Sequence, residues 1–583
     1  MTGDATTTQR EVGELLVAQG KLTAPQLEQV RRRQKRLNLP QHRAVVDLSF
    51  ASEEDTWRAL AEANRLEFVD PSTLDLKKET LELVPIKFIF HHRMLPLAGD
   101  AESLTLAFSE PPRQIELGNL RLLLNKRFKI VLATPSSIHA VIKKQFGLGA
   151  ETIQKLREER GGVDLDREIV FDVQPGKEGD SALEATISAF VDQVLQEALR
   201  LRATDIHLEP YTNTIRLRYR VDGILETVPV PADIRNLHPA IVSRLKIMAG
   251  LNISERRLPQ DGRIAMKTGD EEYDLRVSVV PTKHGEAVAL RILGRQSLFL
   301  DLGQLGMEPE HEAIFAQLTD LPQGMVLLTG PTGSGKTTTL YAALAQANDE
   351  GRKVITFEDP IEYQLDGTVQ IQVRDQIGLT FATGLRSVLR HDPDVVLVGE
   401  IRDYETAEIA IRAAQTGHLV LSTLHTNDSV SAVTRMIEMK IEPYLVASSL
   451  VCSISQRLAR RICRHCAEED KRISASVRKE MAAALRIPAT EVKASHGRGC
   501  VECNQKGHRG RVAIYEFFLL NEAVSDLIQP GVKNSQLREE ARKTGWRSLR
   551  ENAWQKVQRG LIPIAELDRW TRNIDPGTPS AKA

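Results

Sequence analysis

The sequence predicts a multidomain α/β protein whose largest domain is built on a parallel sheet. Its 583 residues exceed what one hydrophobic core accommodates and correspond to three or four domains of roughly 100–200 residues each. Residues 301–455 alternate short apolar strands with helices, which is the pattern of a parallel sheet. In this region a glycine-rich loop that starts at Gly330 joins a strand to a helix. Together, these observations predict one large α/β domain accompanied by smaller modules.

The composition is typical of soluble globular domains and excludes several functional classes. Hydrophobic residues make up 42% and charged residues 27%, and the net charge is −1, so bulk charge predicts no direct nucleic-acid partner. No apolar run reaches the roughly 18 residues that cross a bilayer, and the start MTGDATTTQREV lacks the regions of a signal peptide. We therefore expect a cytoplasmic protein that touches membranes only through partners.

Two smaller modules and a linker precede the large domain. Residues 1–147 mix helical patterns with an apolar, β-branched stretch and predict a small α/β module, whereas residues 148–180 are polar and charged and predict a linker. Residues 181–300 begin with a helical run, Ile187–Leu201, and continue with strands. The clearest strand alternates apolar and charged residues before a tight turn at Asp222-Gly223. Its apolar members are Ile215, Leu217, Tyr219 and Val221, and its arginines are Arg216, Arg218 and Arg220.

The glycine-rich loop has the chemistry of a phosphate-binding site. A strand at Met325–Leu328 leads into the complete GxxxxGK[ST] pattern, and a helical run follows. Backbone N–H groups and the helix dipole would surround the phosphates of ATP, while Lys336 would reach the β- and γ-phosphates and Thr337 would ligate Mg²⁺. The predicted ATP-binding residues are Gly330, Pro331, Thr332, Gly333, Ser334, Gly335, Lys336, Thr337 and Thr338.

Polar residues end the strands that follow the loop. Glu358, Glu400 and His425 each come directly after, or at the end of, a short apolar strand. Because ligands of open parallel sheets bind at the carboxyl ends of the strands, all three should lie near the loop. ATP hydrolysis needs one carboxylate for the attacking water, a second for Mg²⁺ and a sensor of the γ-phosphate, and sequence alone leaves the two carboxylate roles open. His418, seven residues before His425, is either a second catalytic histidine or a core residue.

Four segments follow one another in the large domain: GPTGSGKTTT, ITFEDPIEY, LRHDPDVVLVGEIRD and TGHLVLSTLHTND. They resemble the motifs of the secretion-ATPase superfamily, and best match its type II secretion and type IV pilus assembly branch. The resemblance implies a PAS-like half-module at residues 181–300 and a RecA-like ATPase core at 301–455, assembled as a homohexamer. It further implies that Glu358 is the catalytic glutamate, that Glu400 is the Walker B acid, and that Arg276 and Arg291 are arginine fingers on the half-module.

Two CxxC pairs predict a zinc site. Cys463 and Cys466 precede Cys500 and Cys503, and four thiolates can surround a structural Zn²⁺. Their long spacer predicts an inserted helical hairpin in a zinc subdomain at residues 456–515, and a redox role is the less favoured alternative. Cys452 is expected in an apolar helix, and a solvated or partner-facing helix is expected to carry Arg457, Arg460, Arg461 and Arg464. A helical part at 516–574 and a disordered tail at 575–583 complete the chain. The resemblance extends here, and because retraction motors lack this module, it favours extension.

The amino-terminal segment VGELLVAQGKLTAPQLEQVRRRQ resembles the first repeat of the docking domain in this branch, which in some members binds cyclic di-GMP. The matching positions are Gly13, Leu16, Gly20, Leu22, Leu27 and Gln34. Glu11 stands where the family has an arginine, with Arg10 one position away, so docking is favoured over dinucleotide sensing.

The resemblance implies a function that the residues alone do not reach. We expect a hexameric ATPase that powers pilin or pseudopilin assembly, is peripheral to the inner membrane, and works with a platform protein and a docking protein. A DNA-uptake or nucleic-acid translocase motor, gripping its polymer through the zinc module, is the alternative.

Overall fold

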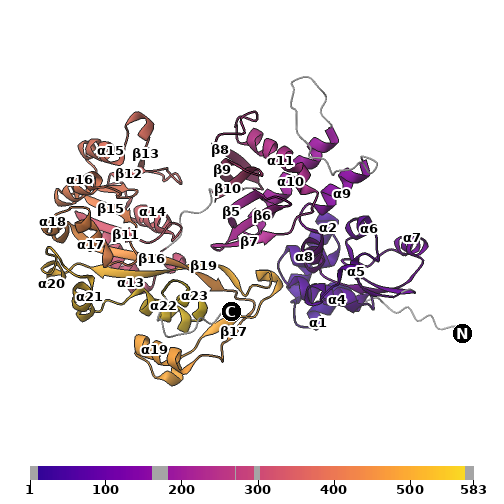
Figure 1. Cartoon of the computed structure of the whole chain (residues 1–583). Coiled ribbons are helices and arrows are strands. Elements are labelled where there is room, and N and C mark those ends of the chain that lie inside the picture. Colours follow the sequence, from indigo (N-terminus) through magenta and orange to yellow (C-terminus); the bar gives the residue numbers. More distant parts are fainter. Residues whose placement is uncertain (1–10, 101, 160–180, 270, 295–301, 572–583) are drawn as a thin grey trace. The chain divides into compact units, whose positions relative to one another are not determined.

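The computed structural model describes residues 11–100, 102–159, 181–269, 271–294 and 302–571. The chain divides into two compact units, the first formed by Met1–Ala265 with Asp274–Ile292, and the second by Met266–Tyr273 with Leu293–Ala583. Among the helices of the described ranges, none combines the length and the apolar character that a membrane-spanning segment needs. Figure 1 shows the elements of both units.

The first unit begins with the small α/β module that the sequence predicts. Four helices precede its first strand, and the four-stranded sheet has the order β1-β4-β3-β2. Leucine and valine side chains of the first helices share one buried core with this sheet. The elements are α1 (Val12–Ala18), α2 (Ala24–Leu37), α3 (Gln41–Asp47), α4 (Glu53–Ala63), β1 (Glu67–Phe68), α5 (Lys78–Leu81), α6 (Ile86–His92), β2 (Met94–Gly99), β3 (Ser103–Phe108), α7 (Gln114–Leu124), β4 (Arg127–Leu132) and α8 (Pro135–Phe146).

The beginning of the predicted linker is instead a packed helix, α9 (Ala150–Glu159). Ile153 and Leu156 of this helix are buried. The side chain of Thr152 accepts a 2.8 Å hydrogen bond from Gln193 on α10 (Ser181–Arg200). Composition misled the prediction because the two apolar side chains on one helix face suffice to pack it among many charged neighbours. Residues 160–180 of the predicted linker lie outside the described residues.

The second module of the first unit is a six-stranded sheet with the order β7-β6-β5-β10-β9-β8. Helix α10 and helix α11 (Ile234–Met248) pack on it. Ile215, Leu217 and Tyr219 of β6 are buried, which confirms the alternation, and Asp222 and Gly223 have φ of 49° and 86° at the turn into β7. The α+β character is confirmed, and the PAS-like assignment stays a prediction. Its strands are β5 (Ala203–Pro210), β6 (Ile215–Val221), β7 (Ile224–Val228), β8 (Gln260–Thr268), β9 (Glu271–Thr282) and β10 (Gly285–Gly294).

The second unit is built on a seven-stranded sheet with the order β13-β12-β14-β15-β11-β16-β19. All neighbouring strands are parallel except the pair β16 and β19. Every residue of the interior strand β11 is buried, and its side chains alternate between two hydrophobic cores, one on each face. The strands are β11 (Gly324–Thr329), β12 (Val354–Glu358), β13 (Val369–Gln372), β14 (Val395–Val398), β15 (Leu419–Leu424), β16 (Leu450–Ile462) and β19 (His508–Leu519).

Helices cover both faces of this sheet, as a parallel α/β fold requires. Helices α12 to α14 contribute to one core, and α15 to α18 contribute to the other. They are α12 (Leu302–Leu305), α13 (Pro309–Thr319), α14 (Lys336–Ala347), α15 (Phe381–Val388), α16 (Tyr404–Gln415), α17 (Ser431–Glu438) and α18 (Pro443–Ser449). The chain then ends in α20 (Glu522–Ser525), α21 (Asn534–Lys543), α22 (Leu549–Gln558) and α23 (Ile564–Thr571), and the predicted tail at 575–583 lies outside the described residues.

The cysteine-containing region is continuous with the large sheet. Strands β16 and β19 cross the predicted boundaries at 455/456 and 515/516, so those boundaries cut through two paired strands. Cys452 lies on β16 and not in a helix, and Arg457, Arg460 and Arg461 share that strand. The expected helical hairpin is wrong too: between the pairs lie β17 (Ala467–Glu469), one α-helix, α19 (Ala475–Leu485), and β18 (Ser495–Gly497). Local apolar patterns do not distinguish a long buried strand from a helix.

Candidate nucleotide site and cysteine cluster

The glycine-rich loop lies at the carboxyl end of β11, directly before α14. Gly330 has φ of 144°, and a Cβ at this position would lie 2.7 Å from the carbonyl oxygen of Gln456 and 2.9 Å from the guanidinium of Arg457. Only glycine therefore lets the loop pass this close to β16. Helix α14 begins at Lys336, so its free N–H groups face the loop.

Lys336 is held inside the loop. Its ammonium donates hydrogen bonds to the carbonyl oxygens of Gly330, at 2.9 Å, and Pro331, at 3.2 Å. Burial lowers the pKa of Lys336 to about 8, the charge of Arg457 acts in the same direction, and Glu400 opposes both. An incoming phosphate can replace these two carbonyls as the partner of the ammonium.

Glu358 is a buried carboxylate at the end of β12. Its Oε1 accepts hydrogen bonds from Thr356, at 2.6 Å, and from Gln370, at 3.2 Å, and Tyr341 donates to its Oε2. Burial raises the pKa of Tyr341, and the nearby charge of Glu358 adds to that effect. These donors satisfy the carboxylate and fix its orientation, as positioning an attacking water would require.

Glu400 and His425 are brought together beyond the ends of β14 and β15. His425 Nε2 lies 3.4 Å from Glu400 Oε2, and Arg402 forms an ion pair with the same carboxylate. The side chain of Glu400 is 18% exposed and that of His425 is 52% exposed, so both can meet a ligand from solvent. The predicted convergence of Glu358, Glu400 and His425 on the edge that carries the loop agrees with the parallel order of their strands.

His418 lies at the other edge of the sheet. It precedes β15, and its backbone oxygen accepts a hydrogen bond from Gly324 at the start of β11. Its Nδ1 is 3.0 Å from the carbonyl oxygen of Ala413 at the end of α16. The six residues of β15 separate it from His425 by roughly 20 Å, at about 3.3 Å per residue. Within this chain the side chain of His418 therefore caps a helix end, apart from the other predicted catalytic residues, and its catalytic role stays a prediction.

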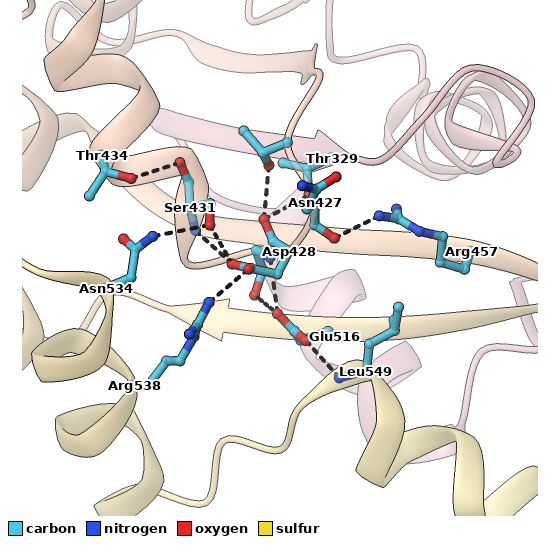
Figure 2. A network of polar contacts seen from close by, with 12 residues as sticks. Thr329, Asn427, Asp428, Ser431, Thr434, Arg457, Glu516, Asn534, Arg538 and Leu549 are labelled. Atoms are coloured by element: carbon cyan, nitrogen blue, oxygen red, sulfur yellow. Dashed lines mark hydrogen bonds and ion pairs between the residues drawn. The ribbon is translucent and has the colours of Figure 1, made fainter. Parts of the chain in front are cut away.

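A polar network that the sequence did not predict connects the nucleotide edge to the carboxyl-terminal helices (Figure 2). Arg457 donates to the carbonyl oxygens of Gln456, at 3.0 Å, and Asn427, at 2.6 Å, so it links β16 to the segment after His425. The neighbouring Asp428 accepts from Ser431 at the start of α17 and pairs with Arg538 on α21, at 2.8 and 2.7 Å. Burial lowers the pKa of Arg457.

Glu516 on β19 is the buried carboxylate of this network. It accepts hydrogen bonds from the backbone of Ser429, at 3.0 Å, and of Leu549 at the start of α22, at 2.6 Å. Burial raises its pKa. A single acid within the apolar run AIYEFF was the signal that could have revealed it, because a buried acid requires partners.

The four cysteines of the two CxxC pairs converge on one point. Their sulfur atoms all lie within 4.8 Å of one another. The distances are 3.8 Å for Cys463–Cys500, 3.8 Å for Cys466–Cys503 and 3.6 Å for Cys500–Cys503. A tetrahedral Zn²⁺ with bonds of about 2.3 Å places its sulfurs about 3.8 Å apart. The backbone N–H groups of Cys500 and Gly507 also point at Cys503 Sγ, each at 3.2 Å. The donor set and its spacing fit a four-thiolate metal.

The two predicted arginine fingers belong to the first unit. Arg276 lies on β9 and Arg291 on β10. Arg291 Nε lies 3.2 Å from Asp205 on β5, and Arg220 pairs with the same carboxylate at 3.4 Å. Their role at the nucleotide stays a prediction.

The amino-terminal repeat forms a packed core. Leu16, Leu22 and Leu27 are buried in it, and the backbone of Gly13 donates to Gln41 at 2.7 Å. Glu11 binds Gln41 and Arg31, both at 3.1 Å, and the hydrogen bond from Gln41 is the main reason its pKa is lowered. Glu11 therefore places a carboxylate, bound by other protein groups, at the position where the family has an arginine.

Comparison with known proteins identifies the family. The model of the family described as "Type II/IV secretion system protein" matches residues 180–569, and that of the "MshEN domain" matches residues 64–152. The chain is 38% identical over 563 residues to the type IV pilus assembly ATPase PilB of Myxococcus xanthus, covering 95% of this chain and 98% of the relative. It is 45% identical over 416 residues to the type II secretion system protein HxcR of Pseudomonas aeruginosa, covering 70% and 83%.

Among solved structures, the pilus retraction motor PilT with bound ADP is similar at 25% identity and a TM-score of 0.43, covering 66% of this chain and 97% of that one. The family match spans more than half of the chain and includes all the strand-end residues described above. The chain therefore belongs to the type II/IV secretion system protein family and is an ATPase of that family.

Proposed function

We propose that the protein is a hexameric motor that hydrolyses ATP and powers the assembly of pilin or pseudopilin subunits. One observation carries the proposal: Lys336, Glu358, Glu400 and His425 meet at one sheet edge in a chain that matches a pilus assembly ATPase over 95% of its length. The motor is placed at the inner membrane through a platform protein and a docking protein. The nucleic-acid translocase is not favoured, since these relatives are named for secretion and pili.

We assign the residues at the nucleotide edge roles that their positions support. Lys336 holds the β- and γ-phosphates, and Thr337, exposed at the start of α14, ligates Mg²⁺. Glu358, fixed by three donors, orients the attacking water; Glu400 holds the Mg²⁺ shell; and His425 senses the γ-phosphate. Arg276 and Arg291 are assigned to charge stabilisation in the transition state.

The four cysteines would hold Zn²⁺, which would be structural because all four positions would be taken by protein thiolates. The sulfur spacing supports this assignment. The ion would tie the first CxxC pair, after β16, to the second, before β19, and would brace the far end of the two paired strands.

The amino-terminal module is assigned to docking. The MshEN match makes cyclic di-GMP a second candidate ligand of this module. Docking is preferred because Glu11 is an anion in the repeat and is engaged by Arg31 and Gln41, where a phosphate-binding cation would be needed.

Phosphate release by the purified chain tests the proposed activity. We expect Lys336→Ala to lower turnover by at least about 100-fold, because the ammonium contacts the transferred phosphate, while exposed Lys440→Ala leaves it unchanged. Glu358→Gln should lower kcat by about 10²–10³-fold. Turnover that survives both changes would refute the assignment, and strong stimulation by DNA would favour the translocase.

The two histidines provide an internal control. His425→Ala should reduce kcat with Mg·ATP, since it adjoins Glu400, whereas His418→Ala, at the opposite edge, should leave kcat within about twofold. Equal losses in kcat would contradict the proposed sensor role.

A further inference from the structure

The second module of the first unit contains a cavity away from its predicted arginine fingers. It has a volume of about 580 Å³ and lies where the turn between β5 and β6, the turn between β9 and β10, and the first half of α11 meet. Small-molecule sites occupy about 300–1,000 Å³, so the cavity is large enough for more than a single ion.

The lining of this cavity is strongly basic. Arg235, Arg256 and Lys283 contribute permanent positive charges, and His238 and His284 contribute imidazoles. Its only carboxylate among the described lining residues, Glu286, is already paired with buried Lys246 at 2.6 Å. The cavity therefore has a net positive charge.

Within the described part of the chain, the three permanent cations also lack acidic partners. Among the described residues, no ion pair within 4.0 Å involves Arg235, Arg256 or Lys283, whereas the adjacent Arg257 pairs with Glu255 at 2.8 Å. Four other arginines of this module do pair with carboxylates: Arg200, Arg218, Arg220 and Arg291. Like charges gathered around one cavity repel each other, and a bound anion converts that repulsion into attraction.

The shape of the cavity is maintained by buried contacts. His238 on α11 is 4% exposed, and its Nε2 lies 2.8 Å from the carbonyl oxygen of Glu286. Gly285 has φ of 122°, and a Cβ there would approach His238 within 3.5 Å. On the other side, His284 lies 3.4 Å from the hydroxyl of Thr212. The two turns are thus fixed against the helix and to each other, which preorganises the cations.

We infer that this cavity binds a phosphate-bearing ligand through Arg235, Arg256 and Lys283. Guanidinium and ammonium groups are the preferred partners of phosphate oxygens, and the volume suits a ligand with two or more phosphoryl groups. A soluble phosphate compound and an anionic lipid headgroup share this chemistry. The lining residues all belong to the first unit and include none of the P-loop, and the inference does not depend on the proposed motor function.

Binding of inorganic pyrophosphate tests the inference. The full chain carries Lys336→Ala to weaken the P-loop, and calorimetry compares it with two further variants in the same background. Adding Arg256→Ala with Lys283→Ala should weaken pyrophosphate binding at least tenfold, because both side chains are exposed cations of the cavity. Adding Arg257→Ala, which removes the adjacent but paired arginine, should change binding by less than twofold.

Two further probes distinguish the source of the phosphate. The first probe is sedimentation of the protein with phosphatidylglycerol vesicles, compared with phosphatidylcholine vesicles. Binding to phosphatidylglycerol that requires Arg256 and Lys283 supports a lipid headgroup. Pyrophosphate binding without vesicle binding supports a soluble ligand. The inference is overturned if neither probe depends on these two residues. It is equally overturned if polyglutamate, which has no phosphate, competes as strongly as pyrophosphate, because the site would then recognise an acidic peptide.

Discussion

The nucleotide edge and the cysteine cluster of the second unit hold their polar groups in different ways. At the nucleotide edge the buried groups already have protein partners: two carbonyls for Lys336 and three donors for Glu358. In the cluster each sulfur has mainly other sulfurs and backbone N–H groups nearby. A nucleotide must therefore exchange existing contacts, whereas a metal ion adds new bonds. The first arrangement favours reversible turnover and the second favours permanent binding.

Removing one cysteine should have the largest effect on stability. Cys463→Ser is expected to abolish a zinc content of about one per chain, because thiolate bonds worth on the order of 10 kcal/mol are lost from the cluster. Metal analysis and hydrogen exchange across residues 463–507 measure the loss. Cys452→Ser is the matched control, since Cys452 is buried on β16 outside the cluster and its substitution should retain the metal. Unchanged zinc in Cys463→Ser would remove the proposed contrast between the two regions.

Substitution of Glu516 tests whether hydrogen bonds between protein groups stabilise the nucleotide edge. Glu516→Gln should lower the free energy of unfolding by about 1–3 kcal/mol, because an amide cannot accept all the hydrogen bonds from Ser429 and Leu549. Chemical denaturation measures this change. Exposed Glu350→Gln should be neutral.

The same variant should alter the pH dependence of stability. Burial raises the pKa of Glu516 above its ordinary 4.5, so the folded chain binds a proton more readily than the unfolded chain. This contribution is full below pH 4.5 and is lost as pH rises through the raised pKa. The stability advantage of the wild type over Glu516→Gln should therefore shrink with increasing pH in that window. An advantage that grows instead would show that the carboxylate is charged when folded.

The smallest expected effect is a pH dependence of nucleotide affinity that arises from the titration of Lys336. Because its pKa is about 8 and a bound phosphate favours the ammonium, ADP affinity should fall by up to about tenfold per pH unit above pH 8. Nucleotide phosphates are fully ionised there, since their last pKa is about 6. Calorimetry between pH 7.5 and 9.5 measures the trend, and Lys336→Arg, whose side chain stays charged, should show none. If the ADP affinity of the wild type does not change with pH, Lys336 takes up no proton when a phosphate replaces its two carbonyl partners.

Motif spacing predicted more of the site than of the surrounding fold. The strand ends at Glu358 and His425 followed from short apolar runs, whose length and sequence indicate parallel strands. In contrast, the sequence predicts an apolar helix around Cys452 and a solvated helix around Arg457, whereas both residues lie on the strand β16. A strand that is buried by partners distant in sequence shows no regular alternation of apolar and polar residues. Helix α9 is the converse case, because its short apolar face lies in a mostly charged segment.

By itself the sequence determined the phosphate loop, the strand-end acids and the two cysteine pairs, because each depends on residue types at short, local spacings. Only the tertiary structure decided that His418 lies at the far edge of the sheet, and that Arg457 and Glu516 connect the nucleotide edge to the carboxyl-terminal helices. It also decided that Arg235, Arg256 and Lys283 of the first unit line one cavity. These features arise where strands and helices far apart in the chain pack together, and hydrogen bonds or charges across such contacts leave no local pattern.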